Sequence, residues 1–248
     1  MKKTVLALTL AALAVPAFAQ DKKAPEPELT ISGNFGLFSD YRFRGISQTE
    51  KKPAAQGGFD LVHKNGFYLG TWTSSVNAEF TGLTASSAGL ELDVYGGYKF
   101  NVGSIGVDIG NLYYYYPGAR SSGSPNTNEV YLGLSYGPVT LKTSYATTKY
   151  FDFGTGSSGS YYVDLSTAIP LSDGLSLKAH VGYLSVKGGD TGTDYRVGIA
   201  KDIDGYVFGL DYVGNSGDWK DTMYESSAST PDKKVGGNGA VVYVTKTF

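Results

Sequence analysis

Residues 239–248 (GAVVYVTKTF), at the end of the sequence, decide the fold that the sequence predicts. Apolar side chains stand at alternating positions, at Ala240, Val242, Val244 and Phe248. A period of two places them together on one face of a β-strand. In a membrane, a sheet bounded by this strand has to pair it with the first strand, because no water is present to satisfy an open edge. The stretch therefore predicts the closing strand of a barrel.

Upstream, the sequence divides into segments of about ten residues that are separated by Gly, Asn, Asp, Ser or Pro. The twelve segments cover residues 29–40, 53–63, 66–77, 88–100, 104–115, 127–136, 139–149, 160–169, 175–186, 193–201, 205–213 and 238–248. A tilted strand needs about 9–11 residues to cross a bilayer. Long and short connections alternate between the segments, as they do in outer-membrane barrels with short periplasmic turns. We predict an all-β fold, an antiparallel transmembrane β-barrel of about twelve strands.

The first nineteen residues have the features of a secretory signal peptide. Lys2 and Lys3 are followed by an apolar run, residues 4–15, and by the A-x-A cleavage pattern Ala17-Phe18-Ala19. We predict cleavage after Ala19 and export from the cytoplasm.

After the predicted cleavage site, residues 20–28 are charged and rich in Pro, and we expect a flexible periplasmic tether. Residues 29–248 then form the barrel. Together with the signal peptide, this organisation predicts a protein of the outer membrane of a Gram-negative bacterium.

Composition excludes several classes of protein and site. The 248 residues include no Cys, which excludes a disulfide framework and a thiolate metal site. A net charge of −2 argues against a nucleic-acid binder. The Asp-Ile-Asp-Gly stretch at 202–205 lacks the later ligands of a calcium loop, and we interpret it as a hairpin turn. We therefore expect no metal and no cofactor.

Charged residues occupy the register opposite to the apolar one, and this register faces the lumen. The candidates for the pore lining are Asp60, Glu91, Asp93, Asp108, Glu129, Lys142, Asp164, Lys178, His180, Arg196 and Asp211, with Lys99 as an addition. As a set they predict a wet lumen with weak cation preference. Taken singly, each is also explained by an ion pair inside a narrow barrel. The alternation does not assign the facing of residues 66–77.

The N-terminal part of the barrel resembles a known family. Residues 39–49 read SDYRFRGISQT, residues 53–60 read PAAQGGFD, and residues 65–76 read NGFYLGTWTSSV. This order is similar to that of the TorF-type porins of proteobacteria. The resemblance implies a small porin-like outer-membrane protein and carries no residue-level mechanism.

Arg42 and Arg44 leave the first strand two residues apart. At the mouth of a pore they would offer permanent donors to an anion or a sugar. Alternatively, they pair with Asp40 or Glu50 inside a folded external loop. A run of four tyrosines, residues 113–116, allows a similar choice between an interfacial strand end and a surface that stacks on sugars.

The sequence does not predict an enzyme. Hydrolysis by a nucleophile requires Ser with a base such as His, yet the only histidines are His63 and His180, and no G-x-S-x-G stretch is present. We predict a porin or porin-like channel for passive diffusion of small hydrophilic solutes. The alternative is a non-conducting barrel whose external loops, above all residues 214–237, bind a partner. In either case we expect contact with outer-membrane lipid and assembly by the barrel-assembly machinery, which would recognise Phe248.

Overall fold

The computed structural model describes residues 27–77, 89–119, 125–151, 153, 155–217, 223–224 and 233–248. The predicted signal peptide, its cleavage site and most of the predicted tether lie outside the described residues. So does most of the loop at 214–237. Among the described residues, no helix is long and apolar enough to cross a membrane.

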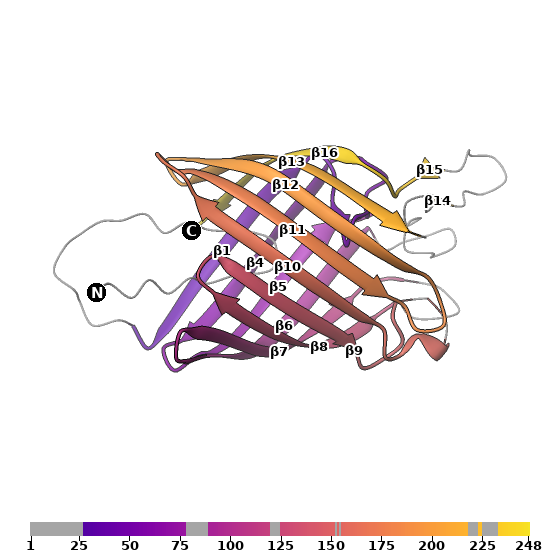
Figure 1. The fold of residues 1–248 in the computed structure, drawn as a ribbon, viewed down its shortest axis with the longest axis horizontal. Coiled ribbons are helices and arrows are strands. Elements are labelled where there is room, and N and C mark those ends of the chain that lie inside the picture. Colours follow the sequence, from indigo (N-terminus) through magenta and orange to yellow (C-terminus); the bar gives the residue numbers. More distant parts are fainter. Residues whose placement is uncertain are drawn as a thin grey trace.

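The described residues form a closed barrel of twelve antiparallel strands (Figure 1). The strands are β1 (Leu29–Phe38), β4 (Ala54–His63), β5 (Phe67–Ser75), β6 (Leu90–Val102), β7 (Ile105–Tyr115), β8 (Thr127–Tyr136), β9 (Val139–Ala146), β10 (Tyr161–Pro170), β11 (Leu175–Ser185), β12 (Thr191–Ile203), β13 (Tyr206–Gly217) and β16 (Gly239–Thr247). Each strand pairs with its neighbours in the chain. The predicted fold class is confirmed.

The barrel is closed where the last strand meets the first. β16 pairs with β1 from Asn34↔Thr247 to Phe38↔Tyr243. Two further backbone hydrogen bonds join Gly33 and Phe248, at 2.8 and 2.9 Å. The closing strand therefore has partners on both sides, β1 and β13, and leaves no open edge in the membrane.

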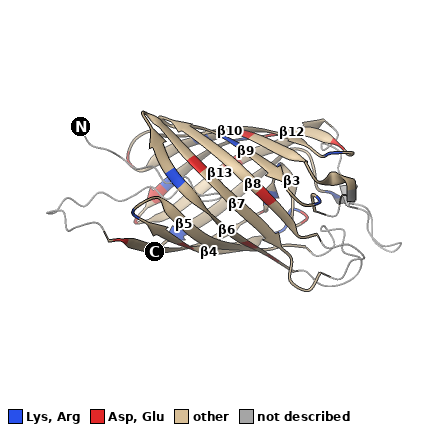
Figure 2. Cartoon of the chain, turned by 90° about the horizontal axis from the view of Figure 1, so that it is seen from below, with Lys and Arg blue, Asp and Glu red and all other residues tan. Residues whose placement is uncertain are grey.

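Side chains alternate between the two faces of the wall. In β6, Leu90 and Val94 are 41% and 40% exposed on the outside, whereas Glu91 and Asp93 are 1% and 6% exposed on the inside. In Figure 2, most of each strand is tan, with charged residues in red or blue at single positions. β5 follows the same rule: its Tyr68 hydroxyl donates to the lumen carboxylate of Asp108, so the even-numbered side chains of β5 point inward.

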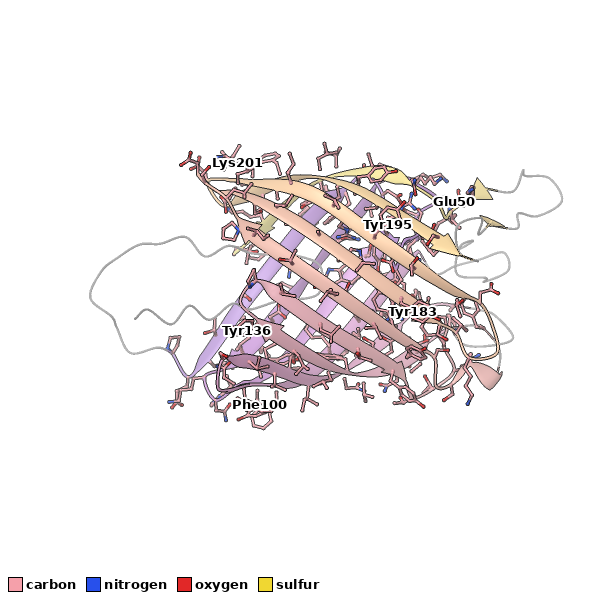
Figure 3. All side chains as sticks on the ribbon, viewed as in Figure 1. Glu50, Phe100, Tyr136, Tyr183, Tyr195 and Lys201 are labelled. Carbon is pink, nitrogen blue, oxygen red and sulfur yellow. The ribbon has the colours of Figure 1, made fainter. Side chains whose placement is uncertain are left out.

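Aromatic side chains project outward near both ends of the barrel. Figure 3 shows Phe100 and Tyr136 toward the end that holds the termini and Tyr183 and Tyr195 toward the other end. Such girdles mark the two interfaces of a membrane with water. At the rim nearest the C-terminus, Lys246 donates to the carbonyl of Asp204 and lies over the ring of Tyr206.

On the inner face, tyrosine rings lie over glycines of neighbouring strands. The pairs are Tyr95 on Gly70, Tyr68 on Gly97, Tyr131 on Gly110, Tyr162 on Gly182 and Tyr243 on Gly209. A ring over a glycine compensates for the missing side chain and keeps the strand register. It also keeps the ring against the wall, so that its hydroxyl reaches wall carboxylates, as Tyr162 reaches Asp194.

We predict that Gly182→Val destabilises the barrel by about 1–3 kcal/mol, because a Cβ there would lie 2.6 Å from ring carbon Cε2 of Tyr162. The measurement is urea unfolding in detergent, followed by heat-modifiable mobility. Gly89→Val is the matched control, since a Cβ at Gly89 meets open space. Equal midpoints for the two variants would contradict the prediction.

Candidate functional site

The connection between β1 and β4 folds into a small hairpin. Its strands are β2 (Arg42–Phe43) and β3 (Ile46–Ser47), which pair through Phe43↔Ile46 and Arg42↔Ser47. The two residues between them, Arg44 and Gly45, have φ of 47° and 80°. Two consecutive positive φ values define the type I′ hairpin turn, which Gly favours at its second position. We call residues 41–49 the finger.

The finger lies inside the barrel. Ile46, Ser47 and Gln48 are 6%, 0% and 5% exposed. The Ser47 amide donates to the carbonyl of Val235, and the Asn77 amide donates to the carbonyl of Gln48. The turn fits tightly against the wall, because a Cβ at Gly45 would lie 2.7 Å from that of Asp194 on β12.

The finger spans the lumen from one side to the other. Its two ends leave β1 and β4, which are neighbours in the ring of strands. Its tip, at Arg44, touches residues of β8, β10 and the β9–β10 connection, which lie across the ring. Because β1 starts at the end of the barrel that holds the termini and the finger follows the end of β1, the finger occupies the opposite end.

Arg44 makes the central contact of the finger. Its Nη1 and Nη2 donate to Oε1 and Oε2 of Glu129 at 2.9 and 2.8 Å, and Nη1 also donates to the Tyr150 hydroxyl at 2.9 Å. The guanidinium lies 4.4 Å from the centre of the Tyr162 ring. The two side chains of the ion pair are only 6% and 1% exposed, so this planar, two-pronged pair is shielded from bulk solvent.

Arg42 has different partners. It pairs with Asp40 and donates to the carbonyls of Gly45, Val235 and Gly237. Pairing with Asp40 was one of the two interpretations that the sequence left open. For Arg44 the structure gives a partner that the sequence did not predict, Glu129 of β8.

Beneath the finger, two further carboxylates face inward from β6. Glu91 accepts hydrogen bonds from the hydroxyls of Tyr41 and Tyr116, both at 2.8 Å. Asp93 is 6% exposed, and its Oδ1 has no hydrogen-bond partner among the described residues. With Glu129, these residues form an acidic group on β6 and β8 that we call the acidic wall.

Three tyrosines outside the strands contribute to this arrangement as neutral groups. Burial, followed by the charge of Glu91, raises the pKa of Tyr41 and of Tyr116 well above the ordinary value. Burial raises the pKa of Tyr150 to about 12. Folding raises these pKa values, so the three neutral hydroxyls stabilise the folded state. Their contribution to folding stability is complete below the ordinary pKa of tyrosine, about 10, and is lost only as the pH rises through the raised values.

Below the finger, the lumen is polar and reached by solvent. His180 contacts Asp164 at 2.6 Å and Asp194 at 3.3 Å, and Arg196 lies 3.6 Å from Asp211. Other wall contacts join Lys99 to Asp108, Lys178 to Tyr243, Tyr95 to Asp60, and Lys142 to the ring of Tyr131. The side chains of His180, Lys99 and Arg196 remain 20%, 35% and 39% exposed.

The structure thus divides the candidates from the sequence into two groups. Glu91, Asp93 and Glu129 lie under the finger, and the other pore-lining candidates lie on the wall below it. Sequence reasoning missed Asp194, although it shares the register of Arg196. It also missed the inward tyrosines. The tyrosine run divides: Tyr114 is buried inside and donates to Glu129, while Tyr113 and Tyr115 are exposed outside.

Within the described part of the chain, no group of three or more His, Cys, Asp or Glu side chains is arranged to hold a metal ion.

Comparison with known proteins gives a family. Residues 22–248 match the model of a family described as "Bacterial protein of unknown function (Gcw_chp)". The chain belongs to this family. The match does not confirm the TorF name, which stays a prediction for this Gcw_chp protein. Among curated proteins, no sequence matches significantly.

Solved structures show the same fold at low sequence identity. A structure titled "KdgM porin" is 10% identical, with a TM-score of 0.52 over 88% of this chain and 99% of that chain. A second, from a study of in-meso crystallization of membrane proteins, is 9% identical, with a TM-score of 0.54 over 88% and 83%. An outer membrane channel from Pseudomonas putida F1 is 13% identical, with a TM-score of 0.46 over 94% and 100%. The first of these likenesses shows that the Gcw_chp chain has the barrel fold of an outer-membrane porin.

We predict that Glu129→Gln loosens the finger, because it leaves the buried Arg44 without a counter-charge, at a cost of about 3–5 kcal/mol. Opening of the finger then exposes the chain to protease. Trypsin should cleave after Arg44 at least about tenfold faster than in the wild type, as followed by mass spectrometry of the folded protein.

Asp164→Asn is the matched control, since Asp164 is a lumen carboxylate that pairs with His180 and makes no described contact with the finger. Equal cleavage after Arg44 in both variants would show that Glu129 does not hold the finger.

Proposed function

We propose that the protein is a porin-like channel of the Gram-negative outer membrane that passes small hydrophilic solutes by passive diffusion. The observation that carries the proposal is the contrast between the two faces of the wall. Outside, large apolar side chains such as Ile31 and Val242 are 67% and 58% exposed. Inside, charged side chains remain partly exposed to solvent below the finger.

The lower lumen carries mixed charge. Lys99 lies near Asp108 and Arg196 near Asp211, each pair on neighbouring strands, and Lys178 donates to the hydroxyl of Tyr243. No long stretch of this lower wall therefore has a single sign. Such a lining stabilises water and polar solutes and gives only weak ion selectivity. We propose the pore-lining candidates of the sequence analysis as the residues that line this passage.

The finger sets the size of what passes. It crosses the lumen at the external end and is held by ion pairs and hydrogen bonds to the wall. Because both of its ends leave neighbouring strands, it can move within the lumen without separating β1 from β16. The proposed channel is therefore narrow while the finger is in place.

The proposal includes the route to the membrane. Residues 1–19 act as a signal peptide that is cleaved after Ala19, and residues 20–28 form the tether. Phe248, 69% exposed at the terminal end of the barrel, serves as the feature that the assembly machinery recognises.

The second candidate function is a non-conducting barrel that binds a partner. It is favoured by the buried finger, which fills the external mouth. The binding surface would then be the external loops, above all residues 214–237, which include the small pair of β14 (Met223–Tyr224) and β15 (Lys233–Lys234).

Planar-bilayer recording separates the two candidates. We expect the wild type to give small steps. Replacing residues 42–47 with two glycines should raise the single-channel conductance several-fold, because the segment that crosses the lumen is removed. A matched control shortens residues 171–174, the turn between β10 and β11 at the opposite end of the barrel from the finger, and should leave the conductance unchanged.

Heat-modifiable mobility identifies folded barrels in every sample. Silence of folded wild type and folded finger variant alike would reject the channel and favour the partner-binding barrel.

A further inference from the structure

Glu129, Tyr150 and Tyr162 surround the guanidinium of Arg44, and we call this site the seat. Its residues are those of a binding site for a cation. We propose that it binds cationic solutes that carry a guanidinium group, and that Arg44 occupies it as an internal stand-in for such a solute. The inference deepens the proposed function, on which it rests, by naming a solute class and a site.

The seat is built almost entirely from parts of the protein other than the finger. Glu129 belongs to β8, Tyr162 to β10, and Tyr150 to the connection between β9 and β10. Tyr114 of β7 donates to Glu129 Oε2 at 3.2 Å and orients the carboxylate. Phe43, 4.8 Å from the guanidinium, is the only finger side chain among the described ring contacts of Arg44. The site therefore persists when the finger withdraws.

The geometry selects a flat cation. The two oxygens of Glu129 receive two parallel N–H donors, which matches a guanidinium and not a spherical ion. The rings of Tyr162 and Tyr150, at 4.4 and 5.6 Å, attract positive charge to their faces. Enclosed from water, these contacts favour a planar, delocalised and weakly hydrated cation over Na⁺ or K⁺.

The surrounding charge gives independent support. Asp93 is buried near the seat with one carboxylate oxygen that has no partner among the described residues. The partners of Glu91 are neutral hydroxyls. Arg44 is the cation that pairs with Glu129, and among the described residues Glu91 and Asp93 form no ion pair. Among the described residues, the acidic wall thus has one ion pair for three carboxyl groups, which favours a cation at Glu129.

Competition between solute and finger follows from this arrangement. Arg44 is tethered, so its effective concentration at Glu129 is high, on the order of millimolar or above. A free guanidinium solute binds the wild type weakly for that reason. Once Arg44 is removed, the same solute should enter the vacated seat.

The test uses the folded full-length variant Arg44→Ala in detergent and titrates it with methylguanidinium at millimolar concentration by calorimetry. Methylurea, which is neutral with the same planar shape, is the control ligand. We expect saturable binding of methylguanidinium at least tenfold tighter than any binding of methylurea. The double variant Arg44→Ala/Glu129→Gln should lose this binding.

Heat-modifiable mobility establishes that each variant is folded. No saturable binding to folded Arg44→Ala, or equal binding to the double variant, would overturn the site. If Arg44→Ala does not fold, Arg44→Lys replaces it, with cleavage by trypsin after the substituted position as the readout. Methylguanidinium should accelerate that cleavage and methylurea should not, and equal rates with both ligands would overturn the proposal.

The calorimetric test does not depend on conductance. Binding by a barrel that is silent in bilayers would leave the site standing and reject the channel. Conductance without binding would leave the channel standing and reject the site.

Discussion

Backbone hydrogen bonds that cannot be left open in lipid are the constraint on which the rest of the structure depends. They force β16 to pair with β1 and so divide every strand into an outer and an inner face. Charges excluded from the lipid face are then confined to one narrow lumen. The pairs of His180 with Asp164 and of Arg196 with Asp211 follow from this confinement, because neighbouring inner side chains have only one another and water as partners.

The same confinement explains the finger. The half of the lumen that holds the finger contains Glu91, Asp93 and Glu129, which are costly to bury without partners. Arg44 and Tyr41 on the finger supply a cation and a hydroxyl to two of these carboxylates. Apolar burial adds to this, because Ile46 packs with Tyr150, Tyr162 and Leu184 in one cluster. One segment therefore narrows the mouth and supplies partners to two carboxylates of the acidic wall.

Much of the fold could be predicted from the sequence, because the period of two and the alternation of loop lengths are local signals. The inward facing of Glu91, Asp93 and Glu129 follows from the apolar residues beside them. The partner of Arg44 could not be predicted, since 85 residues separate it from Glu129 and only barrel closure brings them together. Asp194 was within reach of the sequence pattern, two residues from Arg196. The facing of β5 was not, because its Thr and Ser residues suit either face.

The central claim is that the finger lies inside the lumen in the folded protein. The absence of cysteine from the chain makes labelling of single cysteines its most direct test. In outer membranes, Ile46→Cys, at a site only 6% exposed, should react with a membrane-impermeant maleimide far more slowly than Lys51→Cys, at an exposed site five residues further on. Equal labelling rates at the two positions would place the finger outside the barrel and contradict the claim.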